Sequence, residues 1–361
     1  MNRFPGGHPL RIAVVRALQL GDMLCAVPAL RAIRAAWPEA HITLVGLPWA
    51  KEFAARFSRY LDAFIEFPGF PGLPEQQSSP RRIVEFLRDV QDGQFDLAVQ
   101  LHGSGSHVNE LVALMGARRT AGFYRAGDFI PEPGSFVPWP AAGLEPHRLL
   151  RIVDALGIAP QGDALEFPVM DADRGELDRV PELRALMSGG RPYCLVHPGA
   201  RMRSRRWLAS RFAAVADALV HAGAEVILTG VQDEAPLAAA VRHAMSTRRR
   251  CTDLTGRLSL GALAALLADA RVLVCNDTGV SHIAAALGTP SVVVASGSDV
   301  RRWAPADAGR HRVLWHDVPC RPCMHADCPT GHECAAGVGE REVADAALAL
   351  FAGSRHEAHA I

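Results

Sequence analysis

The sequence predicts an α/β protein with two doubly wound domains, because short apolar segments alternate with longer amphipathic stretches along the chain. Such segments are typical of parallel strands that helices cover on both faces. The expected strands fall into two series, which implies two sheets. They are residues 11–15, 42–46, 64–67 and 97–101, followed by 193–197, 225–229, 272–275, 291–295 and, last, 313–315.

A segment that is charged at first and then rich in turn residues separates the two series. We therefore expect an N-terminal domain at 1–172, a linker at 173–191 and a C-terminal domain at 192–361. Residues 67–80 and 127–146 are rich in Pro and Gly, so we expect loops there. Long loops inside compact domains are usually functional, which makes these two candidates for gripping a second substrate.

Composition limits the class of protein. The chain has 361 residues, of which 49% are hydrophobic and 21% charged, enough to build the cores of about two domains. The formal net charge is zero, so we expect no bulk attraction to nucleic acid. No apolar run approaches the roughly 18 to 20 residues of a membrane-spanning helix, and the first residues lack the pattern of a secretory signal. We expect a cytoplasmic protein.

The most informative segment is Asn276-Asp277-Thr278-Gly279-Val280-Ser281-His282, which lies between an expected strand and a helical pattern. A strand, a tight turn and a helix point free backbone N–H groups and the positive end of the helix dipole at one place, where a phosphate can bind. Gly279 lets a ligand approach the backbone closely. The alternative is an ordinary helix N-cap formed by Asp277 or Thr278. The first ligand class to consider is a phosphorylated small molecule.

Ligands of open α/β sheets bind beyond the carboxyl ends of the strands, so the residues that follow each strand carry information. Asp22 follows the first expected strand and stands near the start of a helix. A carboxylate there can act as a general base if its proton donor is within hydrogen-bonding reach. The alternative is a helix cap with a favourable dipole interaction.

An arginine-rich loop follows the strand at 193–197 and includes Arg203, Arg205 and Arg206. Guanidinium groups match the oxygen pairs of a pyrophosphate, although a run of charges is also typical of a solvated surface. Glu234 follows the strand at 225–229. Its carboxylate can accept hydrogen bonds from ribose hydroxyls, or it can be a first-turn helix residue that the dipole favours.

Four cysteines cluster near the C-terminus with intervals of two, four and five residues. They are Cys320, Cys323, Cys328 and Cys334. This arithmetic fits a small structural site for zinc or iron, and the alternative is a set of reduced free thiols. A cytoplasmic location disfavours disulfides. We name residues 320–334 the Cys-rich segment.

Taken together and in order, five stretches resemble glycosyltransferase family 9, which includes the ADP-heptose:lipopolysaccharide heptosyltransferases. They are Leu20-Gly21-Asp22, Val27-Pro28-Ala29-Leu30, His197-Pro198-Gly199-Ala200, Ser204-Arg205-Arg206-Trp207, and Asn276-Asp277-Thr278-Gly279 with His282. The resemblance implies a GT-B fold, in which two Rossmann-like domains face each other across a cleft. It implies that the nucleotide sugar binds mainly to the C-terminal domain.

The resemblance also assigns roles to residues. Asp22 matches the general base proposed for the family, and Glu234 matches the acidic residue associated with the ribose. Arg205 falls where the family commonly has a lysine that contacts the donor phosphates, a change that keeps the charge but not the geometry. The donor-binding loop of the family is matched by Asp277, Thr278, Gly279 and His282.

The implied chemistry is an inverting transfer in which Asp22 deprotonates an acceptor hydroxyl as it attacks the anomeric carbon. We expect Arg205, helped by Arg203 or Arg206, and the amides of Thr278 and Gly279 to stabilise the leaving diphosphate without a catalytic metal. ADP-heptose is the donor that the resemblance favours, and a lipopolysaccharide-type glycan is the favoured acceptor. A protein or small-metabolite acceptor, a nucleotide-sugar epimerase and a non-catalytic scaffold stay open. Any membrane contact is expected to be peripheral, at the inner face.

Overall fold

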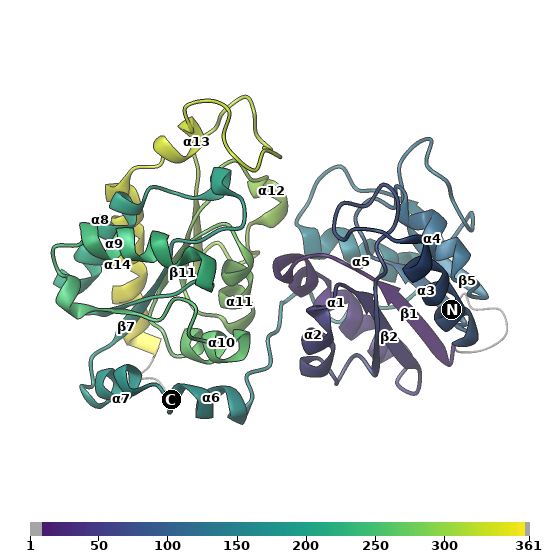
Figure 1. Ribbon diagram of the computed structural model, residues 1–361, viewed down its shortest axis with the longest axis horizontal. Helices are drawn as coiled ribbons and strands as arrows, with labels where there is room; N and C mark the ends of the chain where they lie inside the picture. Colours follow the sequence, from purple (N-terminus) through teal and green to yellow (C-terminus); the bar gives the residue numbers. More distant parts are fainter. Residues whose placement is uncertain (1–8, 358–361) are drawn as a thin grey trace. The chain divides into compact units, whose positions relative to one another are not determined.

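The computed structural model describes residues 9–357 of the chain, with side chains described as far as residue 353. The chain divides into two compact units, which meet in the sequence between Ala164 and Leu165. In Figure 1 the first unit runs from purple to blue, and the second from teal to yellow. Each unit contains a six-stranded sheet, and all strand pairs in both sheets are parallel.

The first unit has the strand order β3-β2-β1-β4-β5-β6. Its strands are β1 Arg11–Val15, β2 His41–Gly46, β3 Ala63–Glu66, β4 Leu97–Gln100, β5 Arg119–Tyr124 and β6 Phe136–Pro138. Its helices are α1 Leu20–Ala36, α2 Ala50–Arg56, α3 Pro80–Asp92, α4 Val108–Leu114 and α5 Glu145–Ala155. This is the strand order of the doubly wound fold: from β1 the chain adds strands on one side as far as β3, and then adds β4 to β6 on the other side. The strand order therefore reverses between β1 and β4, although the two strands are parallel.

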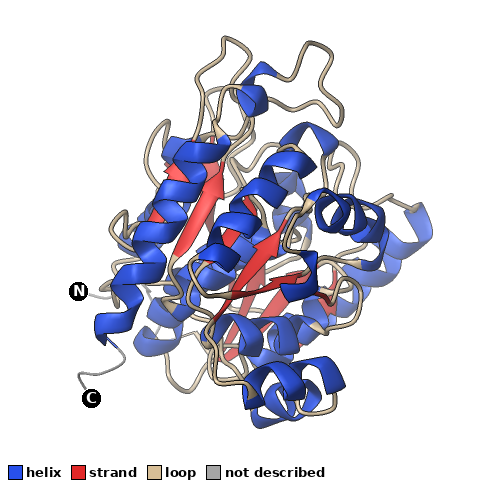
Figure 2. Ribbon diagram, turned by 90° about the vertical axis from the view of Figure 1, so that its left-hand side faces the viewer, coloured by secondary structure: helices blue, strands red, loops and turns tan. Residues whose placement is uncertain are grey.

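The second unit has the order β12-β11-β10-β7-β8-β9, which repeats the same winding and reverses between β7 and β10. Its strands are β7 Tyr193–His197, β8 Glu225–Leu228, β9 Cys251–Asp253, β10 Leu273–Asn276, β11 Ser291–Val294 and β12 His311–Leu314. Its helices are α6 Asp171–Leu177, α7 Pro181–Ser188, α8 Ala209–His221, α9 Ala235–Ala244, α10 Leu260–Ala268, α11 Gly279–Leu287, α12 Val300–Trp303, α13 Glu333–Ala336 and α14 Glu340–Glu357. Figure 2 shows strands with helices on either side of them.

Helices and sheet strands enclose the core of each unit. In the second unit Val196, Val226 and Val274 come from the sheet and pack with residues of α8, including Phe212 and Leu219. All of these side chains are fully buried, which is why the strands read as continuous apolar runs in the sequence. Within the described range, no helix has the length and apolarity that crossing a membrane requires.

The nine strands expected from the sequence are all present, with shifts of one or two residues at some ends, and three further strands were missed. β5 begins with an arginine and contains Gly122, and β6 ends on a proline, so neither has the composition of a buried strand. β9 has three residues and follows three arginines. The loop expected at 127–146 therefore needs correction, because it contains β6 and the first residues of α5.

The linker expected at 173–191 is also different in the structure, because α6 and α7 occupy most of it and belong to the second unit. Three contacts fix these helices there. Arg174 pairs with Asp269 at 2.9 Å. The Glu176 carboxylate accepts hydrogen bonds from the backbone and hydroxyl of Ser259, and Glu182 pairs with Arg257. The charges that suggested a linker are instead partners of residues elsewhere in the second unit.

Candidate functional site

The strand order of the second unit brings two predicted loops to the same edge of the sheet. β7 and β10 are paired neighbours, and the chain leaves them toward opposite sides. In doubly wound sheets ligands bind beyond the carboxyl ends of the strands at this reversal point. The loop after β7 carries the arginines, and the turn after β10 leads into α11. The sequence-predicted donor residues of the second unit therefore belong to adjoining strand ends.

Asn276 joins these two loops. Its side chain is fully buried, and its Nδ2 donates to the carbonyl of Pro198 at 2.7 Å and to that of Gly199 at 3.3 Å. Its Oδ1 accepts the backbone N–H of Trp207 at 2.9 Å. In the sequence, Asn276 stands out only as part of a motif, without a role of its own. A polar residue at the end of an otherwise apolar strand is the signal that marks it.

The N-terminus of α11 is open to a ligand. Thr278 is the N-cap residue, and no side chain makes a capping hydrogen bond there. The Ser281 hydroxyl turns back and donates to the carbonyl of Thr278 at 2.7 Å. The ordinary side-chain cap that the sequence allowed is therefore not present. Free N–H groups and the helix dipole favour an anion at this place, and residues 277–279 are partly exposed.

Arg205 belongs to the loop after β7, and its charge is close enough to Asp277, in the turn before α11, for the two to interact. Burial lowers the pKa of Arg205, and the negative charge of Asp277 opposes that effect. Its Nη2 donates to the carbonyl of Cys323 at 2.8 Å, and its buried Nε has no hydrogen-bond partner among the described residues. Arg205 is partly buried, and an unpaired, buried Nε on a guanidinium is a costly arrangement that a bound anion would relieve.

The other two arginines also contact protein groups. Arg203 is mostly exposed and forms a two-bonded ion pair with Asp327. The Nε of Arg206 donates to the carbonyl of Ala200 at 2.8 Å. Of the three arginines, the contacts of Arg205 fit a phosphate ligand best.

His282 is buried on α11, and its ring meets the indole of Trp303 edge to face at 6.2 Å between ring centroids.

Glu234 is buried beside the loop that follows β7. Its Oε2 accepts the backbone N–H of Val231 at 3.0 Å, so it caps its own turn. A Cβ at Gly199 would lie 2.1 Å from the Glu234 carboxyl carbon, which explains the glycine there. His197 lies 3.9 Å from Glu234, and burial lowers the pKa of His197 while the charge of Glu234 opposes that change. The structure shows the capping contact, and the ribose contact stays a prediction.

The Cys-rich segment does not form the metal knuckle that the cysteine intervals suggested. Among the described residues no group of three or more His, Cys, Asp or Glu side chains is placed to hold a metal ion. Cys323 and Cys334 are buried, Cys328 is partly exposed and Cys320 is exposed, and all four are free thiols. The thiol of Cys328 donates a hydrogen bond to the carbonyl of Thr330 at 3.2 Å. The absence of a catalytic metal stays a prediction.

The first unit places Asp22 at the equivalent strand reversal, between β1 and β4. Asp22 lies in the first turn of α1, and its carbonyl accepts a hydrogen bond from Nε of Arg16 at 2.8 Å. Arg16 is fully buried, donates also to the carbonyl of Leu101, and lies 3.6 Å from the buried carboxylate of Glu145. This buried network was not predicted from the sequence. A single arginine directly after an apolar strand is its signal.

A pair formed by the buried His102 and the partly buried Glu75 fixes the loop that was expected at 67–80. Nδ1 of His102 accepts the backbone N–H of Ala17 at 3.1 Å, and its Nε2 lies 3.4 Å from Oε1 of Glu75. Burial raises the pKa of Glu75, but the hydrogen bond and charge of His102 outweigh it, so the pKa falls below its usual value. This loop is therefore tied to the strand end next to the turn that carries Asp22.

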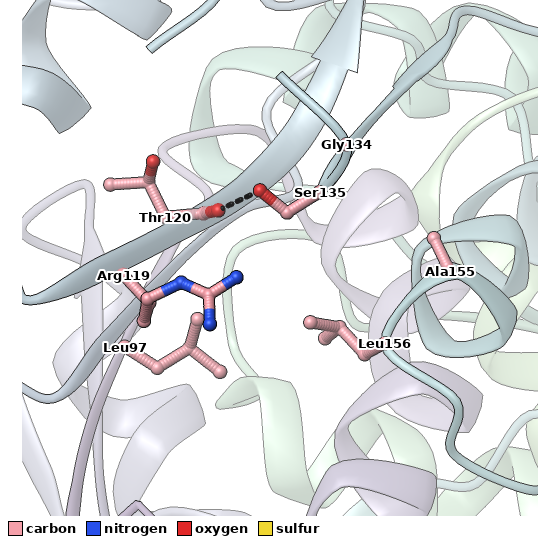
Figure 3. Close-up of a pocket in the computed structure, with 7 residues that line it drawn as sticks. All are labelled: Leu97, Arg119, Thr120, Gly134, Ser135, Ala155 and Leu156. Atoms are coloured by element: carbon pink, nitrogen blue, oxygen red, sulfur yellow. Dashed lines mark hydrogen bonds between the residues drawn. The ribbon is translucent and has the colours of Figure 1, made fainter. Parts of the chain in front are cut away.

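A small pocket of about 40 Å³ in the first unit lies elsewhere (Figure 3). Arg119 and Leu97 line it, at the beginnings of β5 and β4. The Ser135 hydroxyl donates to the Thr120 carbonyl at 2.6 Å on one side of it. The pocket is thus at the amino ends of the strands, opposite the edge where Asp22 lies, and it holds no predicted site residue.

Comparison with known proteins decides the family. The family model described as glycosyltransferase family 9 (heptosyltransferase) matches residues 141–333, more than half of the chain. The chain belongs to glycosyltransferase family 9. It is therefore a glycosyltransferase, and its two doubly wound units correspond to the two domains of a GT-B fold.

Individual relatives agree with this assignment. Lipooligosaccharide heptosyltransferase 2 of Haemophilus influenzae is 23% identical over 79% of this chain and 83% of its own length. A crystal structure of a family 9 glycosyltransferase from Veillonella parvula matches with a TM-score of 0.80, at 22% identity, over 95% of this chain and 97% of that one. The Escherichia coli ADP-heptose lipopolysaccharide heptosyltransferase II structure matches with a TM-score of 0.73, at 20% identity, over 96% and 99%.

Proposed function

We propose that this glycosyltransferase moves heptose from ADP-heptose to a hydroxyl of a lipopolysaccharide-core type glycan, with inversion at the anomeric carbon. The observation that carries the proposal is the uncapped N-terminus of α11 with Arg205 beside it, at the strand reversal of the second unit. Such a site suits the diphosphate of a nucleotide sugar. The names of the relatives, which specify heptose and lipopolysaccharide or lipooligosaccharide, support the donor and the acceptor.

In the proposed reaction the carboxylate of Asp22 takes the proton of the acceptor hydroxyl as its oxygen bonds to the anomeric carbon. The bond between that carbon and the diphosphate oxygen breaks, and the sugar passes through a transition state of oxocarbenium character. Negative charge then grows on the departing diphosphate. Arg205 and the N–H groups at Thr278 and Gly279 are the groups we assign to its stabilisation.

The buried network around Arg16 supports the role of Asp22. A general base must be held within hydrogen-bonding reach of its proton donor. The hydrogen bond from the buried Arg16 to the carbonyl of Asp22 fixes the turn that carries Asp22. The tied loop at 67–80 adjoins that turn through Ala17 and His102, so we assign acceptor binding to this edge of the first unit. A protein or small-metabolite acceptor would use the same edge.

The first test is a transfer assay with ADP-heptose and a deacylated core oligosaccharide that lacks the heptose to be added, read by mass spectrometry. We expect a product one heptose heavier, and Asp22→Asn to lower kcat by about 10² to 10⁴, the usual contribution of a general base. The matched control is Asp171→Asn, because Asp171 is an exposed aspartate in the first turn of α6 and has no proposed role.

Each other outcome of this assay has a meaning. Conversion of the donor without an acceptor would favour an epimerase, and donor binding without any turnover would favour a scaffold. Full activity of Asp22→Asn would remove the general-base role. Activity that a chelator abolished and magnesium restored would contradict a leaving group stabilised by protein groups alone.

The proposed location is the inner face of the cytoplasmic membrane, in peripheral contact with the acceptor, and fractionation of cells that make the protein tests it.

A further inference from the structure

The Cys-rich segment is bonded along its length to the arginine loop that follows β7. Ser204, in the middle of that loop, is 3% exposed. Its backbone N–H donates to the carbonyl of Ala326 at 3.0 Å, and its hydroxyl donates to the carbonyl of His325 at 2.5 Å. Its own carbonyl accepts a hydrogen bond from Nε2 of His332 at 2.9 Å. Each polar group of Ser204 is therefore paired with this one segment.

The same segment also contacts Arg205 and the loop after β11. The carbonyl of Cys323 accepts the hydrogen bond from Nη2 of Arg205, while the N–H of Cys323 donates to the carbonyl of Gly297 at 2.7 Å. Arg321 donates to the carbonyls of Ser298 at 2.5 Å and Ala295 at 3.0 Å. The Cys-rich segment thus connects two strand-end loops that have no hydrogen bond to each other in the described structure.

Asn276 fixes the two ends of the arginine loop, at Pro198 and at Trp207, whereas the residues around Ser204 depend on the Cys-rich segment. Between Arg203 and Arg205 the backbone makes a single short 3₁₀ turn, and such turns have poorer hydrogen-bond geometry than α-helices. Arginine also loses much rotamer freedom when it is fixed. A guanidinium that is held in place before the ligand arrives binds an anion more tightly than one that must be ordered at that moment.

We propose that the Cys-rich segment fixes Arg205 beside the N-terminus of α11, and that Ser204 is the positioning residue through which it acts. This inference rests on the proposed function, because it assumes that Arg205 binds the diphosphate of the donor. It gives the segment a role that needs no metal: its backbone carbonyls and amides hold the donor-binding arginine.

The test is calorimetric titration of the full-length protein with ADP. Ser204→Ala removes only the hydroxyl bond to His325, so we expect the Kd for ADP to rise roughly three- to tenfold, as loss of one hydrogen bond predicts. The matched control is Ser291→Ala. Ser291 is a fully buried serine of β11 in the same unit, and its hydroxyl bonds His311 at 2.9 Å at the other end of the strand. It should lower Tm similarly and leave the Kd unchanged.

A double-mutant cycle separates positioning from general damage. If Ser204 acts through Arg205, Ser204→Ala has no further effect on the ADP Kd in an Arg205→Ala background. An equal effect in both backgrounds, or an equal effect of the Ser291 control, overturns the proposal. Should Ser204→Ala not fold, His332→Asn removes the bond to the Ser204 carbonyl from the other side, and Asn tolerates the left-handed backbone at φ 56°. We expect it to raise the Kd as well, and an unchanged Kd contradicts the proposal.

The same experiment keeps this inference apart from the proposed function. An unchanged ADP Kd in Arg205→Ala alone means that the donor site is wrong, whatever Ser204 does. A raised Kd in Arg205→Ala with an unchanged Kd in Ser204→Ala means that the donor site stands and the positioning role fails.

Discussion

Asn276→Ala is the substitution with the most fully determined consequence, because the side chain makes three hydrogen bonds in a buried place. The change leaves the Trp207 N–H without its partner, and an unpaired buried donor costs about 1 to 3 kcal/mol. Loss of the bond to Pro198, at 2.7 Å, adds about 1 kcal/mol. The expected loss in the free energy of unfolding is about 2 to 4 kcal/mol. For a unit of this size that lowers Tm by about 5 to 15 °C.

The loss should also reach ligand binding, since Asn276 holds the arginine loop against the turn before α11. We expect a weaker affinity for ADP even at a temperature where the variant is fully folded, measured by calorimetry after circular dichroism has located Tm. The matched control is Asn109→Ala in the first unit. Asn109 is 1% exposed and donates to the carbonyls of Phe123 and Phe129, both at 3.0 Å. It should lower stability and leave the ADP affinity unchanged. Unchanged stability in Asn276→Ala, or an equal loss of affinity in the control, would refute the reasoning.

Three further predictions follow from named contacts. Arg205→Lys keeps the charge and loses the guanidinium geometry, so the Kd for ADP should lie between those of the native protein and Arg205→Ala; calorimetry checks the order, and a lysine variant as weak as alanine would contradict it. Burial, partly opposed by the charge of Asp307, lowers the pKa of His311 to about 4, so the stability of the protein should fall as the pH drops from about 6.5 toward 4. Urea unfolding across this pH range should show a smaller fall in His311→Gln. If the stability of the native protein and of the variant fell equally with pH, His311 would not be the cause. His102 holds the pKa of Glu75 below its usual 4.5 against the effect of burial, so the ionised Glu75 stabilises the fold above pH 4.5 and this stability is lost as the pH falls below it. In Glu75→Gln the stability measured by urea unfolding should therefore fall less on acidification. An unchanged loss of stability in acid would show that the pair contributes nothing.

Much of the fold could be predicted because buried parallel strands carry their own signal. β1 and β7 were expected with the bounds that the structure has, since both are apolar on both faces. β6 and β9 carry no such signal, because strands of three residues at sheet edges bury little. The helical character of 171–188 was missed since its charges pair with residues far along the chain, such as Asp269, which local composition cannot indicate.

The site divides in the same way. The positions of Asp22, Arg205 and Asp277 after strand ends were predictable because each follows an apolar strand, and their roles stay predictions. The capping role of Glu234 depends on the path of a single turn. The positions of the four cysteines of the Cys-rich segment depend on the path of its backbone, which the intervals between cysteines do not determine. Asn276 and Arg16 act through distant carbonyls, so the sequence could mark them as unusual without giving their partners.

Calorimetric titration with ADP, GDP, UDP and ADP-heptose, without added metal, tests the central claim most directly. The account predicts selective binding of the adenine compounds, and a large loss of that binding in Arg205→Ala, about 10- to 100-fold for a charge-assisted contact. Preference for another nucleotide would keep the fold and replace the donor. Failure to bind any of the four would contradict the donor site built on Arg205 and the N-terminus of α11.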